Sequence, residues 1–175
     1  MSKTACFTGH RIISEDKKKL SARLYEVLER IITEDEITDF YAGGAVGFDT
    51  IAALNVLRLK EKYNNIRLHL VLPCSNEEQT KNWTAEQKYE FKCILARADS
   101  VEYTSEHYHR KCMGVRNVQL VKNASDYCIC YLDINHKSGT SQTVKMAEEK
   151  GLKVLNLFDT SGKNNTDRNR RNMTE

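Results

Sequence analysis

The chain has 175 residues, of which 40% are apolar and 29% are charged, and its formal net charge is +3. These values suit one globular domain with a sizeable core, and they exclude a strongly basic nucleic-acid-binding face. No run approaches the ~18 consecutive apolar residues of a membrane span, and the first residues form no signal-peptide core. We therefore expect a cytoplasmic protein without a membrane partner, whose six cysteines stay reduced.

The positive charge is concentrated at the C-terminus. Residues 160–175 carry a net charge of +2, which leaves about +1 for the rest of the chain. These residues are polar and almost without apolar anchors, so we expect a disordered tail after one domain at 1–159. A local basic patch on the fold stays open, but nucleic acid is not an expected partner.

Strand-like and helix-like segments alternate along the chain. Short apolar runs predict strands, and apolar residues three and four apart predict helices. The predicted strands are 4–8, 37–41, 66–72, 100–103, 127–132 and 154–158. The predicted helices are one from an N-cap at Ser14 to Ile32, one at 48–63, one that carries Trp83 to Ala98, one that opens at Cys112 and ends near Ser125, and one at 140–150.

This alternation is typical of βαβ units. Such units form a mostly parallel sheet with right-handed crossovers and helices on both faces, so the predicted class is α/β with three layers. Ligands of open parallel sheets bind outside the carboxyl ends of the strands. The segments that leave these ends are 8–11, 42–49, 73–76 and 133–140.

A glycine-rich turn joins the second strand to the next helix. Its sequence is Ala42-Gly43-Gly44-Ala45-Val46-Gly47-Phe48-Asp49. Backbone N–H groups of such a turn approach an anion, and the helix N-terminus adds a favourable field. The turn lacks the Lys-Ser/Thr pair of a nucleotide-hydrolysing loop. We therefore expect Gly43, Gly44, Gly47 and Phe48 at a phosphate site, while Asp49 either accepts hydrogen bonds from a ribose or favours the helix dipole.

Two other turns have similar chemistry. In Thr8-Gly9-His10-Arg11 the glycine allows a tight turn, the threonine supplies a hydroxyl and the arginine is suited to grip phosphate. The alternative is a plain turn with a solvated arginine and a locally bonded His10. Ser138-Gly139-Thr140 supplies hydroxyl and N–H groups at a helix start, where N-capping is the competing role.

The remaining candidates are side chains near these turns. Met113, Arg116 and Asn117 begin a helix, from which Arg116 would reach a phosphate and Asn117 a ribose or base. Trp83 would stack on a base or belong to the core. Asp133 follows the fifth strand and is a candidate carboxylate. The residues 107–112 hold two histidines and one cysteine but lack the further ligands of a zinc site, so we predict no metal and no cofactor.

Together these motifs resemble the YpsA-like family of the SLOG superfamily, over about residues 4–158. The resemblance implies a modified Rossmann fold, a nucleotide-type ligand and often a homo-oligomer. The superfamily includes the Lonely Guy phosphoribohydrolases, the DNA-processing protein DprA, and sensor domains that bind NAD-derived messengers. Met113 and Arg116 match a Met-x-x-Arg motif of the Lonely Guy enzymes, and Gly139-Thr140 match the end of their glycine loop, but Thr143 replaces their catalytic glutamate.

This replacement orders the functional hypotheses. The first is a protein that senses or sequesters an ADP-ribose-, NAD- or cyclic-nucleotide-like ligand without a chemical step, so no catalytic residue is predicted. The second is a phosphoribohydrolase, for which Asp49 or Asp133 would have to supply the carboxylate. The third, by analogy with DprA, is single-stranded DNA binding through the basic tail.

Overall fold

A computed structural model describes residues 2–159, so the predicted tail at 160–175 lies outside the described residues. Six strands and six helices follow each other in this part of the chain. The strands are β1 (Lys3–Gly9), β2 (Ile37–Ala42), β3 (Arg67–Leu72), β4 (Ser100–Tyr103), β5 (Tyr127–Tyr131) and β6 (Lys153–Asn156). The helices are α1 (Lys17–Thr33), α2 (Phe48–Lys60), α3 (Asn76–Thr80), α4 (Ala85–Arg97), α5 (Cys112–Asn123) and α6 (Gly139–Lys150).

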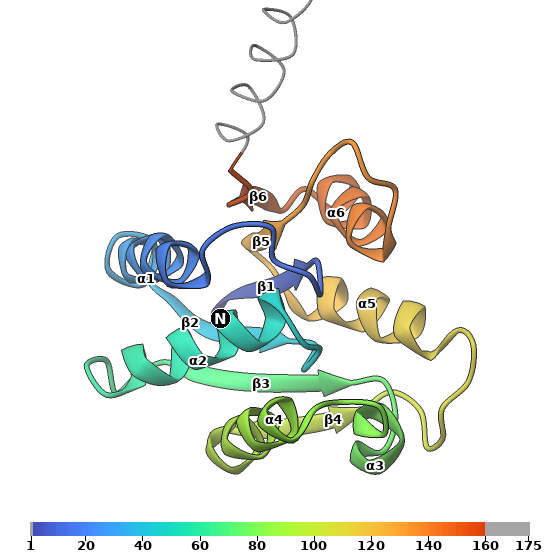
Figure 1. The fold of residues 1–175 in the computed structure, drawn as a ribbon. Helices are drawn as coiled ribbons and strands as arrows, with labels where there is room; N and C mark the ends of the chain where they lie inside the picture. Colours follow the sequence, from blue (N-terminus) through green and yellow to red (C-terminus); the bar gives the residue numbers. More distant parts are fainter. Residues whose placement is uncertain (1, 160–175) are drawn as a thin grey trace, which may run out of the picture.

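The strands form one sheet in the order β4-β3-β2-β1-β5-β6, and every neighbouring pair is parallel. In Figure 1 the sheet runs from β6 at the top to β4 at the bottom. The chain steps from β1 to β2, β3 and β4 on one side, and then returns to β5 on the other side of β1. The order therefore reverses beside β1, which is where ligands bind in open α/β sheets.

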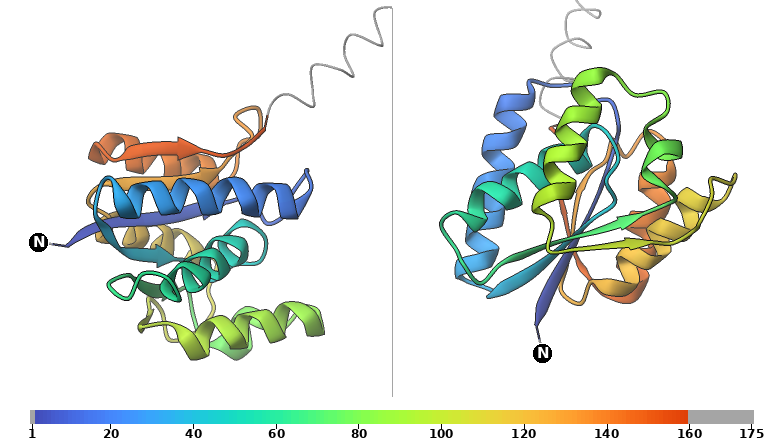
Figure 2. Two further views of the ribbon diagram at one scale, coloured as in Figure 1. Left: turned by 90° about the vertical axis from the view of Figure 1, so that its left-hand side faces the viewer. Right: turned by 90° about the horizontal axis from the view of Figure 1, so that it is seen from below.

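Helices cover both faces of the sheet. Helices α1, α2 and α4 pack side by side on one face, and α5 and α6 pack on the other (Figures 1 and 2). The larger core lies under the first group and includes Phe7, Phe40 and Phe48, which are fully buried. The predicted three-layer, Rossmann-like α/β class is therefore confirmed.

Three local predictions differ from the structure. The N-cap of α1 is Asp16, whose Oδ1 accepts from the Lys19 N–H at 2.9 Å, and the predicted cap Ser14 instead lies 3.0 Å from the Tyr131 hydroxyl. The short helix α3 was not predicted, since its sequence has no apolar repeat. Trp83 precedes α4, which begins after a capping box on Thr84.

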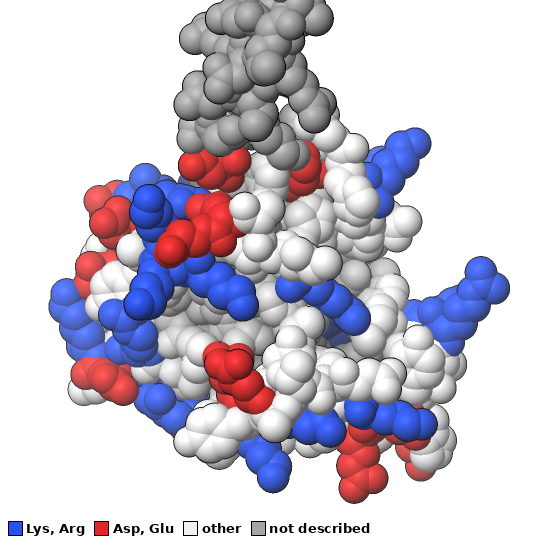
Figure 3. All heavy atoms as spheres, in the orientation of Figure 1, with Lys and Arg blue, Asp and Glu red and all other residues white. Residues whose placement is uncertain are grey.

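All six cysteines are free thiols, and five of them are buried. Cys6, Cys128 and Cys130 lie within strands, as predicted, and act as small apolar side chains. Within residues 2–159, no helix is long and apolar enough to cross a membrane. Figure 3 shows cationic and acidic side chains interspersed over α1 and α2, so this face carries no field of a single sign.

Candidate functional site

A crevice of about 290 Å³ opens at the carboxyl edge of the sheet, beside the end of β1. We call it the carboxyl-edge crevice. The turn after β1, the glycine-rich turn before α2, and the first turns of α5 and α6 all reach it. Its walls are formed by Phe7, Thr8, Gly9, His10, Arg11, Ala45, Asp49, Met113, Arg116, Asn117, Leu120, Ser138, Gly139 and Thr140. Four segments far apart in the sequence thus converge where the strand order reverses.

A buried ion pair forms the floor of this crevice. Arg116 Nη1 lies 3.6 Å from Asp49 Oδ2, and the two side chains are only 7% and 6% exposed. Arg116 also donates to the Gly43 carbonyl and, through Nε, to Asn117 Oδ1 at 2.8 Å. Burial raises the pKa of the Asp49 carboxyl, while Arg116 and the Ala45 N–H lower it. Burial likewise lowers the pKa of Arg116, and Asp49 opposes that shift.

The glycine-rich turn holds this pair in place. A Cβ atom on Gly43 would overlap the Arg116 guanidinium, so only glycine leaves room for the contact. Gly47 has φ +83°, and a Cβ there would overlap the Arg11 backbone. The Gly44 carbonyl accepts from Gln79 Nε2 at 2.8 Å. The carbonyl groups of Gly43 and Gly44 are therefore used inside the protein, to orient Arg116 and anchor α3.

The first turn of α6 supplies backbone donors to the crevice. Ser138 is its N-cap, in a reciprocal capping box with Ser141. In the described part of the chain, the N–H groups of Gly139 and Thr140 donate no hydrogen bond to the protein. Such N–H groups at a helix N-terminus favour an anion.

Arg11 and His10 form the outer wall. Arg11 is exposed and lies 4.0 Å from the Met113 sulfur, Nη2 to Sδ. His10 Nε2 accepts from the Asp133 N–H at 2.9 Å, which places the ring proton on Nδ1. Burial lowers the pKa of His10, and the neighbouring His136 lowers it further. The crevice therefore has one exposed guanidinium above one buried and paired guanidinium.

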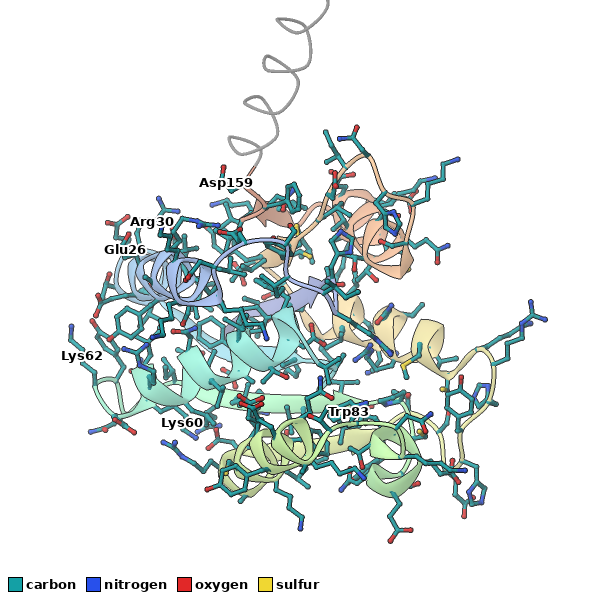
Figure 4. The ribbon with its side chains drawn as sticks, in the orientation of Figure 1. Glu26, Arg30, Lys60, Lys62, Trp83 and Asp159 are labelled. Atoms are coloured by element: carbon teal, nitrogen blue, oxygen red, sulfur yellow. The ribbon has the colours of Figure 1, made fainter. Side chains whose placement is uncertain are left out.

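Several predicted site residues do not line this crevice. Gly43, Gly44 and Gly47 lie behind it, with the internal contacts described above. Phe48 is fully buried and stacks on Tyr131, with ring centroids 5.9 Å apart. Trp83 packs edge-on against Phe91 at 5.5 Å and belongs to the core, its alternative role (Figure 4). Asp133 lies in a neighbouring hollow with His10.

Thr143, which the motif resemblance aligns with the Lonely Guy catalytic glutamate, is fully buried. Its hydroxyl donates to the Gly139 carbonyl at 2.8 Å, within α6. Among the described residues that line the carboxyl-edge crevice, Asp49 is the one that carries a carboxylate, and it is paired with Arg116.

One arrangement on the sheet was not visible in the sequence. His69 Nδ1 lies 2.7 Å from Ser100 Oγ, and its Nε2 lies 2.7 Å from Asp39 Oδ1. His69 and Ser100 are paired in register on β3 and β4, and none of the three residues lines the carboxyl-edge crevice. We interpret the chain of hydrogen bonds as a link between β2, β3 and β4. No cluster of three or more potential metal ligands occurs within residues 2–159.

Two known proteins resemble this chain in sequence. The chain is 37% identical to the uncharacterized SPbeta prophage-derived protein YoqJ of Bacillus subtilis strain 168, over 47% of each chain. It is 26% identical to a UPF0398 protein of Brevibacillus brevis, over 70% of this chain and 62% of that one. The chain thus spans about half to three fifths of the length of these relatives.

A solved structure shares the fold. The X-ray structure of TM1055, a structural genomics target, matches 87% of this chain and 72% of its own, with a TM-score of 0.55 and 15% identity. The model of the YpsA family, described as "YspA SLOG family", matches residues 9–159, which include every wall of the crevice except Phe7 and Thr8. The chain therefore belongs to the YpsA SLOG family.

Proposed function

We propose that the carboxyl-edge crevice binds the phosphate of a nucleotide or nucleotide-derived ligand, such as ADP-ribose, NAD or a cyclic nucleotide. The observation that supports this most directly is the convergence of the Gly139 and Thr140 N–H groups and the Arg11 guanidinium on one crevice. Backbone donors at a helix N-terminus and a forked cation are the groups that bind phosphate in proteins. Family membership adds a nucleotide-related role.

The protein in this proposal senses or sequesters its ligand and performs no chemistry on it. Cleavage of an N-glycosidic bond is helped by a carboxylate that can face the developing positive charge. Asp49 is held in an ion pair with Arg116, and Thr143 donates its hydroxyl inside α6. Neither side chain is arranged for that role.

Equilibrium binding tests the proposal. Isothermal titration calorimetry with AMP, GMP, CMP, cyclic AMP, cyclic GMP, ADP-ribose, NAD and ribose 5-phosphate should give micromolar affinity for at least one compound. Arg11→Ala should weaken it by about 10- to 100-fold, since a hydrogen bond to a charged group contributes about 1.5–3 kcal/mol. Arg30→Ala, an exposed arginine on α1 away from the crevice (Figure 4), is the matched control and should bind normally. Folded protein with no affinity better than millimolar would refute the proposal.

A hydrolytic function is the second candidate, because a carboxyl group with a raised pKa in a crevice is a common mark of an active site. Mass-spectrometric detection of free base from AMP or ADP-ribose would favour a phosphoribohydrolase. In that case Asp49→Asn, if folded, should bind but not turn over. Full activity of this variant would exclude Asp49 as the catalytic group. Native mass spectrometry of the same sample tests the proposed homo-oligomer and reports any co-purified ligand.

A further inference from the structure

A second hollow, of about 310 Å³, adjoins the carboxyl-edge crevice. His10 and Arg11 line both cavities and form the wall between them. The other walls of this side hollow are Ile12, Ser14, Asp133, His136 and Phe158. A ligand whose anionic end lies in the crevice therefore has a neighbouring space that opens on the far side of the β1 turn.

The two cavities differ in chemistry. The crevice offers N–H donors and two guanidinium groups, whereas the walls of the side hollow include three rings and one aliphatic side chain beside Arg11, Ser14 and Asp133. The imidazoles of His10 and His136 lie 5.9 Å apart at 77°, and the Phe158 ring lies 5.1 Å from that of Tyr131. Ile12 is 84% exposed, which leaves its side chain available to cover an apolar surface placed in the hollow.

The charges around the side hollow do not select for a second phosphate, because the Asp133 carboxylate balances Arg11. His10 accepts a hydrogen bond at Nε2 from the Asp133 N–H, so its ring is a neutral platform. The charged groups beside it are Arg11, at the border with the crevice, and the Asp133 carboxylate. Asp133 Oδ1 accepts from the Asn135 N–H at 3.1 Å, and a carboxylate in this place favours a guest that carries N–H or hydroxyl donors.

A flat, uncharged ring with N–H donors fits these walls, because aromatic side chains stack on the π-face of such a ring and a carboxylate accepts from its edge. We propose that the side hollow is the nucleobase subsite of the ligand whose phosphate lies in the carboxyl-edge crevice. This inference deepens the proposed function and depends on it. His10 and Arg11 then lie between base and phosphate, next to the ribose.

The test compares ligands with and without a base. AMP and ADP-ribose should each bind at least tenfold tighter than ribose 5-phosphate in calorimetric titrations. Ile12→Ser and Phe158→Ala should remove most of that tenfold difference and leave the affinity for ribose 5-phosphate unchanged. Val118→Ser is the matched control, because Val118 is 53% exposed on α5 and lies outside both cavities.

The outcomes separate the two proposals. Equal affinities for AMP, ADP-ribose and ribose 5-phosphate would overturn the base subsite while leaving the phosphate site intact. The base subsite would also be overturned if the Ile12→Ser and Phe158→Ala variants, shown to be folded by circular dichroism, still bound AMP and ADP-ribose tenfold more tightly than ribose 5-phosphate. No binding of any compound in the full calorimetric panel would refute the proposed function, and the subsite with it.

Discussion

The Arg116 guanidinium lies 3.6 Å from the Asp49 carboxylate, with both side chains almost fully buried and the Gly43 carbonyl against the same guanidinium. Taking two charges out of water is costly, and their attraction offsets that cost only while both are present. The pair joins the start of α2 to the start of α5, on opposite faces of the sheet. Its integrity therefore sets the shape of the crevice.

Removal of one charge of this pair should destabilise the protein strongly. Asp49→Asn keeps the size of the side chain but leaves Arg116 buried without its counterion, which costs about 3–5 kcal/mol in comparable pairs. Urea unfolding should show a loss in the free energy of unfolding of this order. Lys145→Ala, which breaks an exposed pair with Glu149, should give no measurable loss. Equal effects of the two variants would contradict this account.

Two glycine substitutions should have opposite effects. In Gly43→Ala the new Cβ overlaps the Arg116 guanidinium, so the variant should be destabilised by about 1–3 kcal/mol, as in other overpacked sites. Gly114→Ala places its Cβ in open space on α5 and should be stabilised by about 0.5–1 kcal/mol. Thermal unfolding of both variants, measured beside the wild type, checks the sign of each change.

Stability should depend on pH through His10. Its folded-state pKa is lowered by burial and by His136, so below about 6.5 the unfolded chain binds protons more readily than the folded one. The contribution of His10 is complete above that pH and declines as the pH falls toward the lowered value. His10→Gln offers an acceptor to the Asp133 N–H without titrating, so its free energy of unfolding should fall less between pH 7.5 and 5.5. Parallel curves for both proteins would show that His10 is not responsible.

The two capping boxes separate stability from binding. Ser138→Ala and Thr84→Ala each remove an N-cap hydroxyl, from α6 and α4 respectively, and each should cost about 1 kcal/mol. Ser138 lines the crevice and Thr84 does not. Only Ser138→Ala should therefore weaken nucleotide binding in calorimetry. If both variants lose affinity equally, the loss reflects general destabilisation.

The strands and long helices could be predicted because their apolar residues repeat at the spacing of each element. The predicted strand at 100–103 has the same bounds as β4. The alternation of helices and strands is sufficient to predict a parallel sheet. Helix α3 could not be predicted in this way, since its five residues are held by tertiary contacts such as that between Gln79 and Gly44. The cap at Asp16 was missed because Ser14 is an equally good capping residue in sequence.

The sequence predicted which chain segments form the candidate site, but it did not predict the contacts that individual residues make there. Turns at the carboxyl ends of parallel strands must meet, which brought Arg11, Gly139 and Arg116 to one crevice. A glycine in such a turn allows close approach of a phosphate, but it equally allows close packing of a side chain of the protein, and the sequence does not distinguish the two. The choice at Gly43 depends on where Arg116 lies, 73 residues later in the chain. Ala45 and Leu120 carry no chemical signal in the sequence, so the walls that they form could not be found.

The reactivity of the five buried thiols reports local or global unfolding of this protein. A maleimide or another alkylating reagent can reach them only when the surrounding packing is lost, whereas Cys93, which is partly exposed, reacts from the intact molecule. Labelling of the buried thiols is therefore slow, and its rate reports how often the structure opens transiently. A compound that slows this labelling binds the folded protein, and no engineered probe is needed to detect it.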